Sequence, residues 1–468
     1  MMEFDLVLAN ATVVTASDQY IANIGIRDGK IAYLGTDNIQ ANRVIDAKFR
    51  YVLPGGVDAH CHMDQPCDDG AVMADDFDTG TLSALCGGTT TVIPFALQQG
   101  DESLFDTVSR YRGFAENKAR IDYAVHVIMT SPNKKILSEE VPELTKMGYS
   151  HFKIYMTYDN LKLDDRQILD VLSAAKENNN LIMVHAENDG CISWLTERLL
   201  QEEKKGSEYH AIAHSRIGER EATFRAIALS ELVNVPILIV HVSNQQSLSE
   251  IQRARRRGVN IFAETCPQYL FLTQDDLGGE DGIKYICSPP PRSKYDQDAI
   301  WQGLKDGSFQ VFSSDHCPFD IEGDKGKKVV NHGSCFHNVP NGIPGIETRL
   351  PLLMSHGVDT GKLSIHRFVQ LTATAPARLY GLYPQKGTIA IGSDADLVIW
   401  SDSVQETISN SQLHHNVDYT PYEGMSLTRK PRIVISRGAV VFDDGKPTAE
   451  KGQGQFVFSG KPDTREFV

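Results

Sequence analysis

The chain has 468 residues, of which 41% are hydrophobic and 23% charged, and its formal net charge is −15. This composition is that of a globular protein with a large core, and it excludes extended disorder. The acidic balance argues against nucleic acid and anionic membranes as partners, because clustered lysine and arginine provide most of the affinity for both.

Targeting and redox signals agree with this composition. The segment from Met1 to Asp5 lacks a basic region followed by an apolar stretch, and no apolar run approaches membrane-spanning length. The eight cysteines are scattered without Cys-x-x-Cys spacing, which is typical of reduced thiols. We therefore expect a cytoplasmic protein without a disulfide framework, in which Cys61 and Cys317 only contribute to packing.

Short β-strands are predicted at both ends of the chain. Near the N-terminus, residues 4–36 contain alternating apolar residues, a β-branched run at 12–14 and a hairpin turn at 27–30. Gly-bounded apolar runs at 387–390, 395–400 and 433–438 have the same character. Because chain ends often lie close together, we expect residues 1–53 and 380–468 to form one small β-sandwich domain.

Between these ends, residues 54–379 alternate apolar strands with amphipathic helical stretches, the pattern of a parallel sheet with crossover helices. Eight strands are predicted, at 52–59, 89–95, 123–129, 151–156, 181–185, 236–241, 260–264 and 309–313. This α/β pattern fits a (β/α)8 TIM barrel, whose active site is built at the carboxyl ends of the strands.

Polar residues interrupt or end five of these apolar runs, where a buried strand favours valine or isoleucine. They are His60, His62, Lys153, His185, His241 and Asp315. One such residue alone is more often a satisfied core or loop residue, but the recurrence of imidazole and carboxylate groups at strand ends predicts a site for two divalent cations. Two cations need a bridging anion in addition to these groups.

Lys153 is the unusual member of this series. A protonated amine between two cations is strongly disfavoured, and a neutral amine binds only one of them. Reaction with carbon dioxide would convert the amine into a carbamate, whose two oxygens can bridge two metals. Without the flanking histidines, a lysine paired with an acid or reaching to solvent would be the better interpretation.

The sequence resembles the dihydropyrimidinase and hydantoinase family of cyclic amidohydrolases over essentially its whole length. The stretches that carry the resemblance are 54–62, 75–77, 87–91, 152–158, 184–188, 240–243, 264–269, 287–290, 314–319 and 340–342. The resemblance implies two zinc ions, one held by His60, His62 and Asp315 and the other by His185 and His241, with a carbamate on Lys153 bridging them. It also implies a homotetramer or homodimer.

The resemblance further implies a reaction, hydrolysis of a ring amide in a small cyclic ureide or imide. Two cations would lower the pKa of a bridging water so that hydroxide attacks the carbonyl. Asp315 would carry the proton to the leaving nitrogen, and Tyr158 would donate a hydrogen bond to the developing oxyanion. Ser288 and Asn341 would bind the ring through backbone groups. If Tyr158 has no such role, it is a loop aromatic packed at the barrel mouth.

Related activities remain open from the sequence. A dihydroorotase would need a cation for its substrate carboxylate, and the loop from Met63 to Pro66 offers an aspartate instead. Allantoinase is a closer alternative, and ring size and substituent are undecided. A catalytically inactive scaffold would be expected to have lost ligands, whereas this chain retains all six.

Two departures from the common family pattern bear on substrate preference: Cys61 where threonine is frequent and Pro94 where many relatives carry aspartate. We expect Met63, Gln65, Cys67 and the loop 158–163 to contact the ring substituent. The insertion from Glu322 to Cys335 is interpreted as a lid or a subunit contact, and the stretch ending at Val468 as a subunit-contacting or disordered tail.

Overall fold

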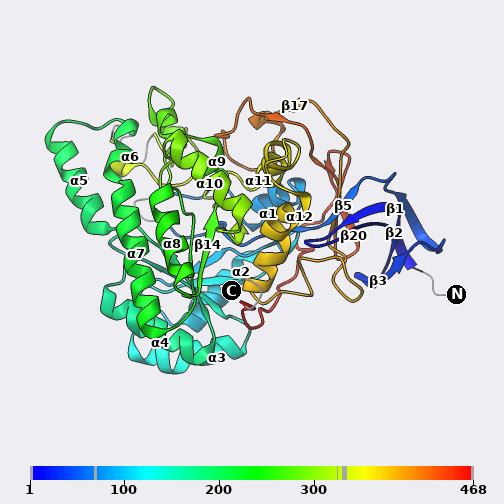
Figure 1. Ribbon diagram of the computed structural model, residues 1–468, viewed down its shortest axis with the longest axis horizontal. Helices are drawn as coiled ribbons and strands as arrows, with labels where there is room; N and C mark the ends of the chain where they lie inside the picture. Colours follow the sequence, from blue (N-terminus) through cyan, green and yellow to red (C-terminus); the bar gives the residue numbers. More distant parts are fainter. Residues whose placement is uncertain (1–3, 68–70, 324, 329–334, 465–468) are drawn as a thin grey trace.

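The computed structural model of the chain describes residues 4–67, 71–323, 325–328 and 335–464. Figure 1 shows the strands β1, β2 and β3 at one end of the longest axis and helix α5 at the other, with the parallel strands between them. Half of the insertion predicted as a lid or subunit contact (324 and 329–334), and the end of the predicted tail (465–468), lie outside the described residues.

Strands from both ends of the chain pair in one nine-stranded sheet, in the order β21-β20-β19-β16-β5-β1-β2-β3, with β4 also paired to β1. The bounds are β1 (Phe4–Val14), β2 (Gln19–Arg27), β3 (Lys30–Gly35), β4 (Ala41–Asp46), β5 (Tyr51–Pro54), β16 (Leu397–Trp400), β19 (Pro431–Ser436), β20 (Ala439–Asp443) and β21 (Lys446–Pro447). The antiparallel pairing of β5 with β16 joins the N-terminal strands to the C-terminal ones.

The turn between β2 and β3 follows its sequence signature. Arg27 pairs with Lys30, and the two residues between them have positive φ, 53° at Asp28 and 73° at Gly29. Both central residues of a type I′ hairpin turn need this conformation, which Asp and Gly tolerate. The predicted hairpin is thus confirmed, whereas the strand predicted at 387–390 is wrong, because these residues form no strand.

The remaining long strands are parallel. One sheet has the order β15-β14-β13-β12-β11-β10-β8, and a second has the order β6-β7-β9. The bounds are β6 (Gly56–Asp58), β7 (Thr89–Val92), β8 (Phe95–Leu97), β9 (Asp122–Tyr123), β10 (His126–Ile128), β11 (His151–Tyr155), β12 (Leu181–His185), β13 (Ile237–Ile239), β14 (Ile261–Thr265) and β15 (Val311–Phe312). A parallel bridge between Cys61 and His316 brings the segment after β15 beside the segment after β6, so the strands follow a strongly curled path.

Three of the predicted strands are interrupted. The run 52–59 divides at Gly55, with β5 in the nine-stranded mixed sheet and β6 in the parallel sheet β6-β7-β9. A side chain at Gly55 would place its Cβ 2.1 Å from Thr90 Oγ1, so glycine permits this close crossing between sheets. The run 89–95 breaks before Pro94, which has no amide hydrogen for the ladder, and the run 123–129 breaks between β9 and β10.

Helices follow most of the parallel strands, as expected for crossover connections. They are α1 (Phe77–Cys86), α2 (Leu104–Ala115), α3 (Val141–Lys146), α4 (Asp165–Asn178), α5 (Asp189–Gln201), α6 (His210–Ala213), α7 (Arg216–Val233), α8 (Gln245–Arg256), α9 (Gln268–Phe271), α10 (Lys294–Asp306), α11 (Arg349–Leu353), α12 (Ile365–Val369) and α13 (Ala375–Leu379). Asp164 caps α4 by accepting a hydrogen bond from the Gln167 amide. Helices α4, α7 and α8 lie side by side against the strands (Figure 1).

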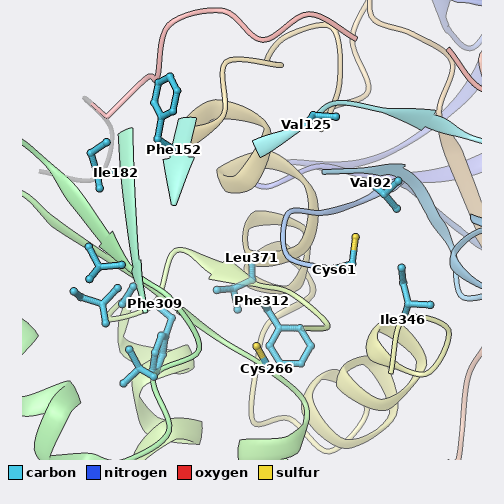
Figure 2. Close-up of a cluster of buried hydrophobic side chains, with 14 of the residues drawn as sticks. Cys61, Val92, Val125, Phe152, Ile182, Cys266, Phe309, Phe312, Ile346 and Leu371 are labelled. Atoms are coloured by element: carbon cyan, nitrogen blue, oxygen red, sulfur yellow. The ribbon is translucent and has the colours of Figure 1, made fainter. Parts of the chain in front are cut away.

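Alternate residues of the parallel strands face two separate cores. Phe152 and Ile182 belong to the outer cluster, between the strands and the helices, part of which Figure 2 shows. Tyr155 and Met183 belong to the inner cluster. Lys153 faces the inner side, with its amine 4.3 Å from the centre of the Phe95 ring, so β11 carries the predicted bridging residue toward the centre of the curl. None of the described helices has the length and apolar character needed to cross a bilayer.

Candidate active site

The six predicted metal ligands meet at the carboxyl ends of the parallel strands. His60 and His62 follow β6, Lys153 lies in β11, His185 ends β12, His241 follows β13 and Asp315 follows β15. Each is buried, with at most 9% of its surface exposed. His241 and Asp315 have positive φ values of 37° and 49°, a costly conformation for residues other than glycine that is found disproportionately at functional sites.

The first group consists of His60, His62 and Asp315. Asp315 Oδ1 lies 3.1 Å from His60 Nε2 and 3.5 Å from His62 Nε2. One ligand atom from each of the three residues lies within 4.8 Å of the other two, which is close enough for all three to hold one cation.

The second group consists of His185 and His241, whose Nδ1 and Nε2 atoms are 2.9 Å apart. Lys153 connects the two groups, because its amine lies 2.9 Å from His60 Nε2. In the described part of the chain no carboxylate forms an ion pair with Lys153. The lysine therefore lacks the acidic partner that would identify it as an ordinary buried ion pair.

The outward ring nitrogens of three of these histidines face oxygen atoms. His60 Nδ1 lies 2.6 Å from Glu264 Oε1, and His185 Nε2 lies 2.8 Å from Glu187 Oε2. His62 Nδ1 lies 2.7 Å from Gln65 Oε1. In the tautomer that protonates these outward nitrogens, as is usual for metal-binding histidines, the other nitrogen of each ring has a lone pair for a metal.

This arrangement tests whether the residues fit divalent cations. The lone pair of His60 Nε2 then faces Asp315 Oδ1, and two electron-rich atoms at 3.1 Å repel each other unless a cation lies between or beside them. His241 Nδ1 is buried without a hydrogen-bond partner. The donor set of imidazoles and a carboxylate is the set that Zn²⁺ favours, so the site fits the implied metal.

Burial changes the acid–base properties of the cluster. It lowers the pKa of the Lys153 ammonium, and it raises the pKa of the Glu264 carboxyl. Burial would also raise the pKa of Asp315, but the interactions of its carboxylate with His60 and His62 outweigh burial and hold that pKa below its usual value. Asp315 is therefore an ionised acceptor, and Lys153, with a pKa of about 8, loses its proton more readily than an exposed lysine.

The predicted substrate-binding residues lie together on another wall of the same cavity. Asn341 Nδ2 donates to the Tyr158 hydroxyl at 3.4 Å, and Ser288 also hydrogen-bonds to that hydroxyl. Tyr158 has a φ of 71°, an unusual backbone conformation for tyrosine, and its ring centroid lies 5.5 Å from that of His185. Burial raises the pKa of the Tyr158 hydroxyl, which keeps it a hydrogen-bond donor.

A cavity of about 370 Å³ connects the metal-ligand cluster to Tyr158, Ser288 and Asn341. Its apolar side carries residues from several loops and from the end of β8: Pro66, Ala71, Met73, Leu97, Leu161 and Phe319. This volume and the mixture of a polar floor with apolar walls suit a small cyclic molecule with a substituent. In the described part of the chain no arginine lines the cavity.

The loops around this cavity differ in part from the sequence-based expectation. Gln65, Cys67 and residues 158–161 line it, whereas Met63 lies in the outer core and cannot contact a ligand there. Asp64, which was expected to make the loop acidic toward a substrate, instead accepts a hydrogen bond from the Phe77 amide at 3.0 Å. Cys317 is also a correction, because it lines the cavity as well as packing.

Sequence reasoning missed two carboxylates that hold the histidines. Glu264 lies near the end of β14, and it also accepts a hydrogen bond from the His241 amide at 3.1 Å. Glu187 contacts both His185 and His214, whose Nδ1 is 3.0 Å from Glu187 Oε1. The sequence does contain a signal for both residues, because Glu264 ends an apolar run and Glu187 follows His185 by two residues. Both were included only in the stretches that resemble the family, and neither was assigned as a hydrogen-bond partner of a histidine.

The fold and this cluster define a class of α/β enzyme, in which imidazole and carboxylate groups converge at the carboxyl ends of curled parallel strands. Residues 51–441 match the model of the amidohydrolase family. The chain is 41% identical over 455 residues to the D-hydantoinase of Rhizobium radiobacter, covering 97% of this chain and 98% of that protein. It is 42% identical over 458 residues to the D-hydantoinase of Geobacillus stearothermophilus, covering 97% and 96% of the two chains.

A solved structure gives the same result. The dihydropyrimidinase from Brevibacillus agri NCHU1002 matches with a TM-score of 0.94 at 41% identity, covering 97% of this chain and 99% of that one. The chain therefore belongs to the amidohydrolase family, and within that family its similarity is to hydantoinases and dihydropyrimidinases.

Proposed function

We propose that the protein hydrolyses the ring amide of dihydropyrimidines or 5-substituted hydantoins and releases N-carbamoyl amino acids. The observation that carries this proposal is one cavity with a metal-ligand cluster on one wall and Tyr158, Ser288 and Asn341 on another. The names of its relatives, D-hydantoinase and dihydropyrimidinase, support the same substrate class.

His60, His62 and Asp315 would hold one zinc ion, and His185 and His241 the other. Lys153 would bridge them as a carbamate, formed when its neutral amine adds to carbon dioxide and releases a proton. When bound, two zinc ions supply a water of lowered pKa and polarise the ring carbonyl. Among the described residues Lys153 forms no ion pair with a carboxylate and contacts His60 instead, which supports this role, since a carbamate would add the bridging anion that two cations need.

Side chains of the protein would transfer the proton, stabilise the oxyanion and orient the ring. Asp315 takes the proton from the attacking water and returns it to the ring nitrogen as the C–N bond breaks, because an amide anion is a poor leaving group. The hydroxyl of Tyr158 donates to the carbonyl oxygen as it gains negative charge. Ser288 and Asn341 orient the ring through backbone groups, and Asn341 also holds the Tyr158 hydroxyl.

Other functions have less support. A dihydroorotate-type acid would need a cation, and no arginine lines the cavity in the part of the chain that the structure describes. An inactive scaffold is not favoured, since all six ligands are present and converge. Allantoin remains a candidate substrate, because it is a hydantoin with a polar substituent that Gln65 or Asn160 could contact.

The finer architecture belongs to the same proposal. We propose that the parallel strands close as a (β/α)8 barrel over residues 54–379, supported by the hydrogen bond from the Asp315 amide to His60 O at 2.9 Å. Residues 1–53 and 380–468 would form the β-sandwich domain. By family resemblance the protein would be a homotetramer or homodimer that acts in the cytoplasm.

Ring-opening kinetics test the function. The zinc-loaded protein would be assayed for kcat/KM on dihydrouracil, a 5-substituted hydantoin, allantoin and dihydroorotate. We expect turnover of dihydrouracil, the hydantoin or both, and the preferred ring then separates the two activities. Absence of turnover on all four rings by protein with full metal content would contradict the proposal.

A further inference from the structure

A second cluster of potential metal ligands lies outside the predicted active site. Cys86 ends α1, Glu347 precedes α11, and His414 belongs to the excursion 401–430 that contains β17 (Glu406–Thr407) and β18 (Ser426–Leu427). These three residues are far apart in the sequence, yet one ligand atom from each lies within 4.8 Å of the other two.

Several contacts fix this cluster. His414 Nδ1 lies 2.9 Å from Glu347 Oε1, and the His414 amide donates to Glu347 Oε2 at 2.8 Å. Ser83 also donates to Glu347 Oε2 at 3.1 Å. A Cβ at Gly87 would lie 2.3 Å from the Glu347 carbonyl oxygen, so the glycine next to Cys86 allows the two segments to approach.

The geometry is that of a preformed site for a borderline-soft cation. Thiolate, imidazole and carboxylate are the three ligand types of protein-bound Zn²⁺, and tetrahedral coordination places ligand atoms about 3.3–3.8 Å apart. The nitrogen–oxygen pair, 2.9 Å apart, is somewhat closer than that spacing, and all three ligand atoms lie within 4.8 Å of one another. Shifts of up to about 1 Å in side chains would complete the coordination.

A cavity of about 370 Å³ opens on the cluster and leaves room for a further ligand. Cys86, Glu347 and His414 lie in its wall, which continues through Thr348, Leu413 and Phe442. The thiol is 5% exposed, while the Glu347 and His414 side chains are 11% and 27% exposed. An ion can therefore reach the cluster from the cavity, and water can occupy a fourth position.

We propose that Cys86, Glu347 and His414 form an additional metal site, which takes Zn²⁺ or a similar thiophilic divalent cation with water as the fourth ligand. On binding, the S–H bond of Cys86 breaks, its proton goes to solvent and a sulfur–metal bond forms. The proton between His414 Nδ1 and Glu347 also goes to solvent, the ring keeps a proton on Nε2, and a bond from Nδ1 to the metal forms. No change of oxidation state is involved.

The structure also indicates what such an ion would stabilise. Two residues after His414, the Asn416 amide donates to Asp75 Oδ1 at 2.8 Å, and Asp75 Oδ2 lies 3.0 Å from His316 Nε2. His316 directly follows Asp315. An ion at Cys86 would therefore fasten the 401–430 excursion to α1 and support the segment behind Asp315, so we assign it a structural role independent of ring opening.

Cadmium titration of the zinc-loaded enzyme tests this site, because a cadmium–thiolate bond has an ultraviolet charge-transfer band and the predicted active-site ligands include no thiol. Wild type is compared with Cys86→Ser and, separately, His414→Gln, with metal content measured after gel filtration. Cys191→Ser is the matched control, since Cys191 is a partly exposed cysteine on α5, away from the cluster.

We expect wild type and Cys191→Ser to bind one metal beyond the active-site ions, with the thiolate band and a higher melting temperature. Cys86→Ser should lose the band and the added metal, and His414→Gln should bind it more weakly, both with unchanged kcat. If wild type binds no metal beyond the active-site ions, or if Cys86→Ser keeps the band, the proposal is overturned. The wild-type stoichiometry decides the question even if a variant does not fold.

Discussion

Two buried lysines show how differently this fold uses the same side chain. Lys386 lies between the mixed sheet and the parallel strands, with its amine 2.6 Å from Asp122, 2.7 Å from Asp396 and 3.1 Å from Asp394. Lys153 is equally buried, at 1% exposure, but its hydrogen-bond partner is the ring of His60.

The electrostatic consequences are opposite. Burial alone would lower the pKa of both amines, and it does so for Lys153. At Lys386 the charges of Asp396, Asp122 and Asp394 overcome burial and raise the pKa of the amine above its ordinary value. A buried lysine paired with three carboxylates is structural, whereas one that contacts an imidazole and has a lowered pKa is suited to chemistry.

The largest effect is expected from Lys153→Met. Loss of the bridging group should remove at least one metal and lower kcat/KM by more than about 10³-fold, because metal activation contributes several kcal/mol to the barrier. The metal-free variant should be no less stable than metal-free wild type, since an apolar side chain replaces a buried amine without an ion pair. Metal analysis, ring-opening rates and melting temperatures measure these effects. Full activity with intact metal content would contradict a bridging carbamate on Lys153.

Lys386→Met should show the reverse pattern. It leaves three carboxylates buried together, which should cost about 3–5 kcal/mol of unfolding free energy. The kcat per folded, metal-loaded molecule should remain that of wild type. Urea denaturation measures the first quantity, and a small loss of stability would mean that water reaches these carboxylates.

The same comparison has a pH dependence. Because the folded-state pKa of Lys386 is raised, its stabilising contribution is complete below the unfolded-state value of about 10.4 and is lost as pH rises through the higher folded-state pKa. The stability difference between wild type and Lys386→Met should therefore be constant near neutral pH and shrink in strong alkali. A difference that disappears already near neutral pH would contradict the assigned direction of this pKa shift.

Tyr158→Phe tests the other wall of the cavity. Loss of an oxyanion donor should lower kcat by about 10²–10³-fold. Metal content should not change, because the hydroxyl contacts Asn341 and Ser288 rather than a predicted ligand. An unchanged kcat would show that the Tyr158 hydroxyl does not stabilise the oxyanion and that the side chain only packs at the barrel mouth.

A smaller effect is expected from Glu264→Gln. The carboxylate orients His60, and substitution of such a partner typically lowers metal affinity by about 10–100-fold. Competition with a chelator measures this affinity. Glu250→Gln is a matched control, since Glu250 lies on α8 and pairs with Arg253; equal affinities for the two variants would show that Glu264 does not support the metal site.

The sequence predicted the position of the site better than its surroundings. Strand ends such as His185 are local signals, because a polar residue stands where an apolar one is expected. The partner of His60 could not be assigned in this way, since Glu264 is 204 residues away and only the curl of the sheet brings them together. The prediction that Met63 contacts the ring substituent was wrong for a similar reason, because the direction of a loop side chain depends on packing rather than on sequence spacing.

Prediction of the fold was also limited to features with local sequence signals. The parallel pattern and the hairpin at Asp28 and Gly29 have local sequence signatures, and both were confirmed. The division of 52–59 at Gly55 depends on the approach of Thr90 from another strand. The Cys86, Glu347 and His414 cluster has no sequence signature, because it joins three segments that only the fold brings together.

The most direct test of the central claim is ¹³C NMR of zinc-loaded protein prepared with ¹³C-labelled bicarbonate. We expect one protein-bound carbamate resonance in wild type, present in Lys386→Met and absent in Lys153→Met. Absence of that resonance in active, fully metal-loaded wild type, or its survival in Lys153→Met, would contradict the assignment of Lys153 as the carbamylated bridge.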